Sequence, residues 1–242
     1  MSGKTIVITG GAIGLGRELT RLYSERGHRV VICGRTENAL EEVRALFAGV
    51  VPVCADLAAA AGRKLLVDRL HELDQPIDLL IHNAAVQYAH DFLGGCTLAE
   101  KIETELAVNL TAPIELTIDL LPLLRQAGSA RVAFVSSALS RVPKKSAPVY
   151  CATKAGVSNF ARGLRYQLEG SGIGVTDVVP DLILTRMAAG RGDKALSASE
   201  AATRIVAGLD QGADDIRLGR VGKLFSLHRL WPELAYRVLK AS

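Results

Sequence analysis

The 242-residue sequence lacks the features that mark secreted, metal-binding or membrane-spanning proteins. Its four cysteines show no C-x-x-C spacing and no nearby histidine, which argues against a metal site and favours reduced thiols. The amino terminus has no long apolar region or cleavage site of a signal peptide, and no uncharged apolar run is long enough to span a bilayer. We therefore expect a soluble, cytoplasmic protein without a metal.

A strong excess of one charge is also absent. The net charge is +4, and the basic residues are scattered along the chain rather than gathered into a stripe. This pattern is typical of a solvated surface of mixed charge, and it predicts neither a nucleic-acid nor a membrane partner. No repeat, low-complexity tract or linker interrupts the chain, so we expect one domain over residues 1–242.

Short apolar runs alternate with longer amphipathic segments. The short runs are rich in β-branched residues and predict buried strands at residues 4–9, 29–34, 50–55, 77–82, 130–137, 174–180 and 215–219. The longer segments predict helices, among them 15–26, 36–47, 98–125 and 149–168. This alternation predicts an α/β fold: a doubly wound, mostly parallel seven-stranded sheet with helices on both faces and a ligand site at the carboxyl ends of the strands.

Two loops flank that predicted site, at residues 86–96 and 181–196. The second loop ends at "SASE", where Ser197 and Glu200 have the spacing of a helix capping box.

The glycine-rich stretch "TGGAIGLG", residues 9–16, follows a predicted strand and opens a predicted helix. Gly10 permits a tight turn, while Gly14 and Gly16 allow a pyrophosphate to approach the amino terminus of the helix. The alternative is a turn that only connects strand to helix. The context favours a dinucleotide site.

Tyrosine and lysine stand four residues apart twice, at Tyr150 and Lys154 and at Tyr236 and Lys240. The spacing alone does not separate chemistry from coincidence, but Ser137 precedes Tyr150 by thirteen residues at the end of a predicted strand, and no serine stands in that relation to Tyr236. We interpret the second pair as accidental. Its helix has an apolar stripe that predicts core packing: Trp231, Leu234 and Val238. For the whole basic, aromatic-bearing tail, residues 221–242, an oligomer contact or a membrane surface is the alternative.

Taken in order, these motifs resemble the short-chain dehydrogenase/reductase family over nearly the whole chain. The stretches "SALSRVP", "PVYCATKAG" and "LRYQL" are most similar to a bacterial subgroup named after D-alanine transfer to teichoic acids. The resemblance implies an NAD(P)-dependent oxidoreductase with four catalytic residues: Asn109, Ser137, Tyr150 and Lys154. It implies cofactor contacts from a larger set: Thr9, Gly10, Gly14, Leu15, Gly16, Asp56, Asn83, Tyr150, Lys154 and Thr185.

The chemistry explains why such a set is needed. A tyrosine has a pKa near 10, so proton exchange near neutral pH requires a stabilised phenolate. Lys154 lies on the same helix face as Tyr150 and can stabilise the anion; by resemblance it also holds the nicotinamide ribose. Ser137 would bind the substrate oxygen, and Asn109 would hold a water that relays protons from the lysine.

Three positions depart from the family pattern. "HNAA" at 82–85 replaces N-N-A-G, so His82 is expected to be a buried strand-end histidine without a catalytic task, and Ala85 adds a methyl group near the cofactor. Asp181 follows Pro180 where the family has glycine. Its carboxylate could face water, repel anionic substrates or take part in binding.

Arg35, in "CGRT" after the second predicted strand, stands where an NAD enzyme would carry an acid. Its guanidinium can pair with a 2′-phosphate, which favours NADP(H), with NAD(H) possible if Arg35 faces solvent. The expected substrate is a small or medium carbonyl or alcohol, with His90 and Arg186 as polar contacts. The pocket around it should be apolar: Val86, Tyr88, Leu139, Val142, Pro143, Leu182 and Met187.

Two other classes of function stay open. An esterase-like hydrolase could use Ser137 as a nucleophile with Tyr150 and Lys154 as its base, and a nucleotide-binding regulator would have no turnover. Whatever the function, we expect a homodimer or homotetramer, because two long helices carry more apolar residues than one contact with the sheet needs. These residues are Ile102, Leu106, Leu110, Val157, Phe160 and Leu164.

Overall fold

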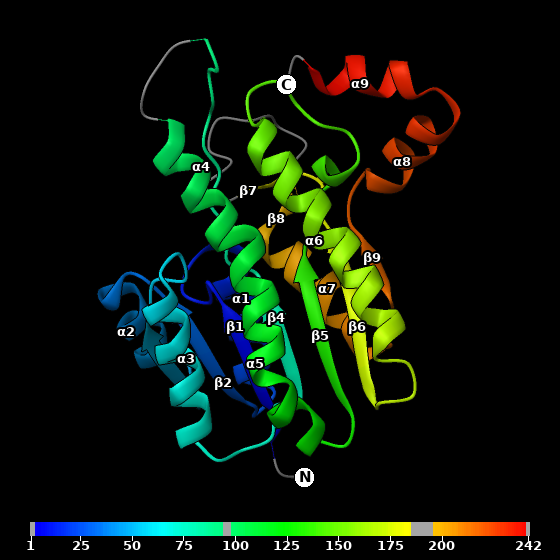
Figure 1. The fold of residues 1–242 in the computed structure, drawn as a ribbon. Helices are drawn as coiled ribbons and strands as arrows, with labels where there is room; N and C mark the ends of the chain where they lie inside the picture. Colours follow the sequence, from blue (N-terminus) through cyan, green and yellow to red (C-terminus); the bar gives the residue numbers. More distant parts are fainter. Residues whose placement is uncertain (1–2, 94–97, 185–195, 241–242) are drawn as a thin grey trace.

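Strands and helices alternate along the chain in the computed structural model, which describes residues 3–93, 98–184 and 196–240 (Figure 1). The strands are β1 (Thr5–Thr9), β2 (Arg29–Gly34), β3 (Val50–Cys54), β4 (Leu79–His82), β5 (Ala130–Val135), β6 (Ile173–Val179), β7 (Ile183–Leu184), β8 (Leu196–Ser197) and β9 (Asp215–Arg217). The α-helices are α1 (Gly14–Glu25), α2 (Glu37–Leu46), α3 (Ala60–Glu72), α4 (Leu98–Leu106), α5 (Ala112–Gln126), α6 (Pro148–Gln167), α7 (Ala198–Asp210), α8 (Val221–Leu230) and α9 (Pro232–Lys240). Two short helices complete the set: the π-helical η1 (Ala107–Thr111) and the 3₁₀-helical η2 (Ala138–Ser140).

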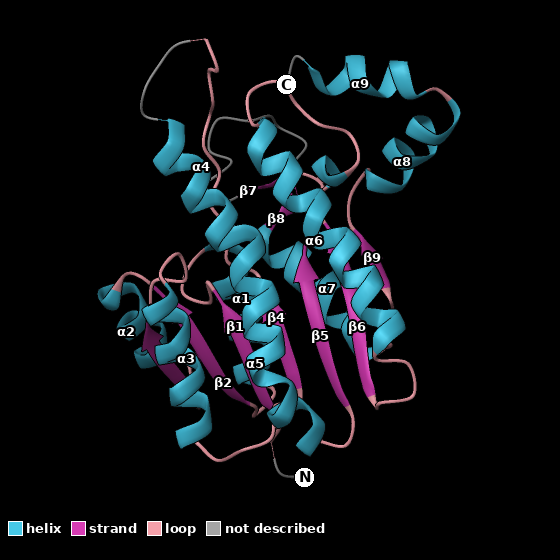
Figure 2. Ribbon diagram, viewed as in Figure 1, coloured by secondary structure: helices cyan, strands magenta, loops and turns pink. Residues whose placement is uncertain are grey.

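Seven strands form one parallel sheet in the order β3-β2-β1-β4-β5-β6-β9 (Figure 2). The chain first builds outward from β1 through β2 to β3, then returns to pair β4 with the other side of β1. Such a reversal leaves a crevice between the carboxyl ends of the two strands where ligands bind. The predicted doubly wound seven-stranded sheet is confirmed, with strand ends shifted by at most two residues.

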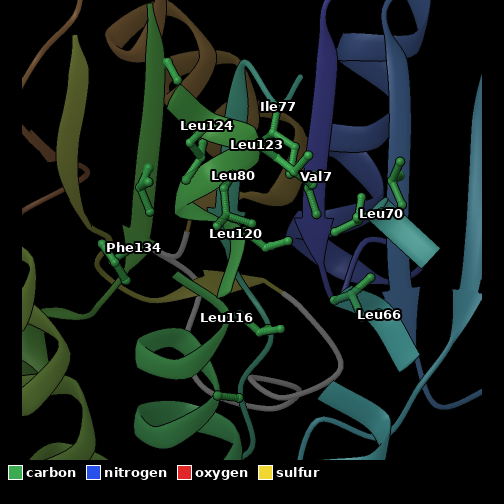
Figure 3. Packing of buried hydrophobic residues seen from close by; sticks show 14 of the residues in the cluster. Val7, Leu66, Leu70, Ile77, Leu80, Leu116, Leu120, Leu123, Leu124 and Phe134 are labelled. Carbon is green, nitrogen blue, oxygen red and sulfur yellow. The ribbon is translucent and has the colours of Figure 1, made fainter. Parts of the chain in front are cut away.

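Alternate residues of the strands point to opposite faces of the sheet and pack in two separate cores, one on each face. In β1, Val7 joins the core under α3, α5 and α6, and Ile6 and Ile8 join the core under α1, α2 and α7. Figure 3 shows the first core, to which leucines of α5 such as Leu116 and Leu120 belong together with Val7 and Leu80. A fully buried leucine or isoleucine contributes about 1.5–3 kcal/mol to folding, so both faces hold the strand ends in place.

The predicted helix 98–125 is present as α4, η1 and α5 in succession. Its stretch Ala99–Gln126 is long and apolar enough to cross a membrane by length and composition. In this fold the stretch packs on the sheet, because Leu116, Leu120 and Leu124 are buried in the first core. It therefore has the position of a core helix.

The described cysteines, Cys33, Cys54 and Cys151, are free thiols, and Cys96 lies outside the described residues. Although β2 and β3 are neighbours, Cys33 is buried and Cys54 is exposed. Within the described ranges, no group of three histidine, cysteine, aspartate or glutamate side chains is placed to hold a metal ion.

The last two helices lie at the carboxyl-end side of the sheet, with α9 beyond α8 (Figure 1). Helix α8 is anchored by Val221 and Phe225, which are buried, whereas α9 buries only Ala235. The prediction that Trp231, Leu234 and Val238 pack in the core is wrong, since all three side chains are exposed. The predicted capping box at the start of α7 is confirmed by reciprocal hydrogen bonds between Ser197 and Glu200.

Candidate active site

The turn from β1 into α1 depends on glycines. Gly10 and Gly14 have φ angles of +67° and +54°, which glycine adopts without strain. A Cβ on Gly16 would collide with the carbonyl oxygen of Gly10, so this glycine is needed for the packing of the turn itself. Leu15 is buried in the core, which leaves only its backbone for a ligand. Helix α1 begins with no side-chain cap and no acidic residue in its first turn, and its free N–H groups fit an anion such as a pyrophosphate.

Thr9 and Asn83 fasten this turn to the end of β4. The Thr9 hydroxyl oxygen accepts hydrogen bonds from the backbone N–H groups of Asn83 (2.9 Å) and Ala84 (3.0 Å). The Asn83 amide donates to the carbonyl oxygens of Thr9 (2.9 Å) and Gly10 (3.2 Å). Both side chains therefore fix the turn after β1 against the end of β4 at the switch point.

Arg35 and Asp56 follow β2 and β3, next to each other along the sheet edge. Both side chains are exposed. Arg35 makes no side-chain hydrogen bond or ion pair with any residue in the described ranges. The Asp56 carboxylate accepts from the Ala58 N–H at 3.0 Å and stays accessible. An unpaired guanidinium at this edge fits the adenosine end of a dinucleotide. Thr185, the remaining predicted cofactor contact, lies outside the described residues.

Ser137, Tyr150 and Lys154 meet where β5 ends. The Ser137 oxygen accepts from the Leu139 N–H at 3.2 Å, and its hydroxyl is hydrogen-bonded to Tyr150. One helical turn after Tyr150, the Lys154 ammonium lies 5.6 Å from the centre of the tyrosine ring and donates to the Val135 carbonyl oxygen at 2.7 Å. The structure therefore brings together three of the four predicted catalytic residues.

Burial moves the pKa values of this cluster in opposite directions. Desolvation lowers the pKa of Lys154 to about 8, partly offset by the negative charge of Asp177. Desolvation also raises the pKa of Tyr150 to about 12, against the lowering effect of the Ser137 hydrogen bond. In this arrangement burial outweighs the lowering effect of the hydrogen bond, so the pKa of Tyr150 lies above its ordinary value.

Asn109 lies beside the cluster in the π-helical turn η1 and is buried. Its side-chain oxygen accepts from the Val86 N–H at 2.8 Å, and its amide donates to the Val86 carbonyl oxygen at 2.8 Å and to the Thr153 hydroxyl at 3.3 Å. Asn109 thus joins the loop after β4 to the helix that carries Lys154. Single π turns are frequent at functional sites, and sequence periodicity did not reveal this one.

His90 and Glu105 form a buried pair that the sequence analysis missed. The His90 Nε2 lies 2.6 Å from one Glu105 oxygen, and the other oxygen accepts from the Tyr88 N–H at 3.0 Å. Both side chains are fully buried, so the prediction that His90 contacts the substrate is wrong. The signal in the sequence that could have indicated this pair was the acidic Glu105 at the start of the apolar stretch "ELAVNL".

Two of the departures from the family pattern have structural tasks. His82 is buried at the end of β4, as predicted, with its Nε2 2.9 Å from the Thr117 hydroxyl and its ring stacked on Phe134. Asp181 accepts from the Arg220 side chain at 3.0 Å, so its carboxylate ties the end of β6 to the start of α8. This ion pair with Arg220 is not among the three roles suggested for Asp181 from the sequence.

The expected substrate lining is only partly accessible. Val86, Tyr88, Leu139 and Leu182 are half-buried and Pro143 is exposed, but Val142 is fully buried, and Arg186 and Met187 lie outside the described residues. A polar cavity of about 200 Å³ opens on the other side of α6. It contains none of the predicted catalytic residues, and its walls include Ser140, Arg141, Arg162, Asp177, Arg217 and Phe225.

Known proteins are similar to this chain in sequence and in architecture. The sequence profile described as short chain dehydrogenase matches residues 4–195. The "Uncharacterized oxidoreductase DltE" of Bacillus subtilis is 30% identical over 227 residues, which cover 91% of this chain and 90% of that protein.

Two solved structures are also similar. A short-chain dehydrogenase from Sphingobium yanoikuyae in complex with NADPH is 27% identical, with a TM-score of 0.83 over 96% of this chain and 94% of that one. A short chain dehydrogenase from Burkholderia cenocepacia in complex with NADP is 25% identical, with a TM-score of 0.86 over 98% of both chains. The chain therefore belongs to the short-chain dehydrogenase family of NAD(P)-dependent oxidoreductases.

Proposed function

We propose that this protein transfers hydride between NADP(H) and a small or medium carbonyl or alcohol, with Tyr150 as the general acid and base. The observation that carries the proposal is the cluster of Ser137, Tyr150 and Lys154 at the carboxyl end of β5. The nicotinamide cofactor supplies the hydride. The side chains of the chain itself bind the substrate oxygen and move the proton.

In the reducing direction, Ser137 orients the substrate oxygen and Tyr150 donates its proton to it. A pKa of about 12 keeps that proton on Tyr150 until the oxygen becomes basic. The phenolate left behind needs about 1.4 kcal/mol of stabilisation for each unit by which its pKa must fall. Lys154, with a pKa of about 8, is mostly protonated at neutral pH and offers its positive charge within the same desolvated site.

Asn109 supports this cluster from the side. We infer that the water of the proton relay is held at the π-helical turn, because the Asn109 side chain is already engaged with Val86 and Thr153. The Val135 carbonyl oxygen sets the position of the Lys154 ammonium, and Asn109 holds the neighbouring residue of the same helix, Thr153. Asn109 is thus a positioning residue for Lys154.

The cofactor would lie across the crevice between β1 and β4. The amino terminus of α1 would hold the pyrophosphate, Asp56 the adenine end and Lys154 the nicotinamide ribose. Arg35 supports the preference for NADP(H), because its exposed guanidinium lacks a partner in the described chain and can pair with a 2′-phosphate. The two solved relatives that hold NADPH and NADP agree with this assignment.

We also propose a symmetric oligomer that uses α4, α5 and α6. Of the six apolar residues that suggested it, Val157 and Leu164 are used in the core of the chain itself. Leu106 remains exposed, and α5 and α6 add exposed Ile118 and Tyr166. Sedimentation of the chain at micromolar concentration as a dimer or tetramer is the expected result, and a monomer would contradict it.

The test of the proposed function is consumption of NADPH in the presence of a panel of aldehydes and ketones, alongside thermal unfolding with NADP(H) and NAD(H). We expect carbonyl-dependent oxidation of NADPH and a rise in melting temperature with the cofactor. Ester cleavage at full rate without nucleotide, lost in Ser137→Ala, would instead identify a hydrolase. Tight NADPH binding with no turnover on any carbonyl would identify a regulator.

A further inference from the structure

Exposed apolar side chains gather at one place on the chain. Five large ones fall within nine residues at the end of α8 and in α9: Leu230 (63% exposed), Trp231 (62%), Leu234 (48%), Tyr236 (39%) and Val238 (55%). Leu234 and Val238 lie four residues apart on α9, and Trp231, which directly precedes the helix, extends their stripe at its amino end. Scattered single apolar residues are normal on a surface, whereas a continuous stripe indicates a binding surface.

The positive charge of the protein gathers at the same place. Residues 220–240 carry five basic residues and one acidic residue, a net charge of +4, which equals the net charge of the whole chain. The remaining residues are therefore balanced, and this local excess favours the membrane surface that the sequence left as an alternative for this tail over the expected core packing. The basic residues are Arg220, Lys223, Arg229, Arg237 and Lys240.

Arg237 and Lys240 lie on α9, and both are exposed. Along the helix they follow Glu233 at spacings of four and seven, which places them on a polar stripe beside the apolar one. A short helix with an apolar stripe that includes tryptophan, flanked by basic residues, is typical of segments that lie in a membrane interface.

We propose that the segment 220–240 docks the protein on the surface of an anionic lipid bilayer. The charge selects this occupant over a second copy of the chain, because a symmetric contact would bring two positively charged segments together, even with Arg220 paired to Asp181. Anionic headgroups complement the same charge, and Trp231 and Tyr236 have the amphipathic rings that favour the headgroup level.

The docking segment is attached firmly to the candidate active site. Phe225 and Val221 of α8 pack against Ala138, the residue after Ser137, and Arg220 pairs with Asp181 at 3.0 Å. A protein docked through this segment would therefore present the carboxyl-end side of its sheet to the bilayer (Figure 1).

Trp231 is the only tryptophan of the chain, so its fluorescence reports on this surface alone. The experiment titrates the full chain with vesicles of phosphatidylglycerol and phosphatidylcholine, and with vesicles of phosphatidylcholine only. We expect the emission of Trp231 to shift to shorter wavelength with the anionic vesicles only, and 0.5 M NaCl to reverse most of the shift. An emission unchanged by anionic vesicles would overturn the proposal, as would a shift without lipid that grows with protein concentration, which would indicate a second copy.

A pair of variants separates local charge from total charge. Each removed charge near the surface should weaken partitioning about fivefold, so Arg237→Gln with Lys240→Gln should weaken it about thirtyfold. The control, Arg125→Gln with Arg204→Gln, removes two exposed arginines elsewhere and should leave partitioning within about twofold. Equal losses in both pairs would reject a specific docking segment. If a variant fails to fold, the emission of Trp231 in the unmodified protein still decides, because it shifts only when this segment meets the lipid.

Discussion

The two halves of the sheet differ in whether their functional side chains are exposed or buried and hydrogen-bonded. In the half from β1 to α3, the ligand-facing groups are open: Arg35 and Asp56 are exposed, and the first turn of α1 is uncapped. In the half from β4 to β6, the functional groups are buried and bonded: Asn109, Thr153 and Lys154 all have partners within the chain.

This difference follows from what each half must do. A cofactor brings its own charges and hydroxyls, so the first half can leave its polar groups to solvent until the ligand arrives. Proton transfer needs fixed geometry and low solvation, so the second half must satisfy its buried polar groups in advance. Substitutions of the exposed groups of the first half, Arg35 and Asp56, should therefore change affinity alone, and substitutions of the buried groups of the second half should change rate, stability or both.

The largest effect is expected for Tyr150→Phe in the second half. The ring and its packing remain, but the proton donor is lost, so kcat for carbonyl reduction should fall by at least about a thousandfold while the Kd for NADPH is retained. Tyr236→Phe is the matched control, because it belongs to a Tyr-x-x-x-Lys pair of the same spacing and is exposed on α9. Equal losses in both variants, or activity that survives in Tyr150→Phe, would remove Tyr150 from the reaction.

The next effect is on stability. Asn109→Ala would leave the half-buried N–H and carbonyl of Val86 without their side-chain partner and break the link to Thr153. We expect the free energy of unfolding to fall by about 2–4 kcal/mol, measured by denaturant titration. Asn38→Ala, an exposed asparagine of α2 in the first half, should stay within about 0.5 kcal/mol of the unmodified protein. A loss as small as that of the control would mean that the π turn does not depend on Asn109.

The same contrast explains how far the sequence could predict the structure. Alternating apolar runs and helical stripes determine which segments become strands and helices, and the parallel sheet then places residues that follow strands at one edge. This was enough to bring Gly10, Asn83, Ser137 and Tyr150 to one side of the sheet. The groups of the first half, from β1 to α3, were therefore largely predictable, because the ends of the strands alone define their positions.

The second half, from β4 to β6, was less predictable, because its contacts depend on the exact path of loops and helix turns. The π turn at Asn109 has no periodic signature, and the partnership of His90 with Glu105 depends on how a loop folds back over α4. Burial also decides the direction of the Tyr150 pKa shift, and it cannot be read from a residue spacing. The stripe on α9 shows the same limit: its spacing was correctly identified, but not whether another element covers it.

A smaller effect, on affinity alone, is expected in the first half. If Arg35 pairs with the 2′-phosphate, Arg35→Ala should weaken NADPH binding by about ten- to hundredfold, leave NADH binding unchanged and leave the melting temperature unchanged. The preference should also shrink with added salt, because the guanidinium is exposed. Arg17→Ala, another exposed arginine of this half, is the control. Titration of both cofactors decides the matter: a ratio of dissociation constants that is unchanged in Arg35→Ala would show that Arg35 only faces solvent.

The smallest effect concerns His82, at the end of the strand where the two halves meet. Thr117 donates its hydroxyl proton to the Pro113 carbonyl at 2.6 Å, so the His82 Nε2–H donates to Thr117, and Nδ1 has no partner in the described chain. Burial lowers the pKa of His82 to about 3, and the unfolded chain titrates near 6.5. Between these values the unfolded state binds more protons, so stability falls as the pH falls. From pH 7 to 5.5 this one residue should remove about 1 kcal/mol from the free energy of unfolding.

His82→Gln should flatten that part of the pH profile, and His71→Gln, at an exposed histidine of α3, should not. Parallel profiles for the unmodified protein and His82→Gln would show that His82 does not contribute to this pH dependence.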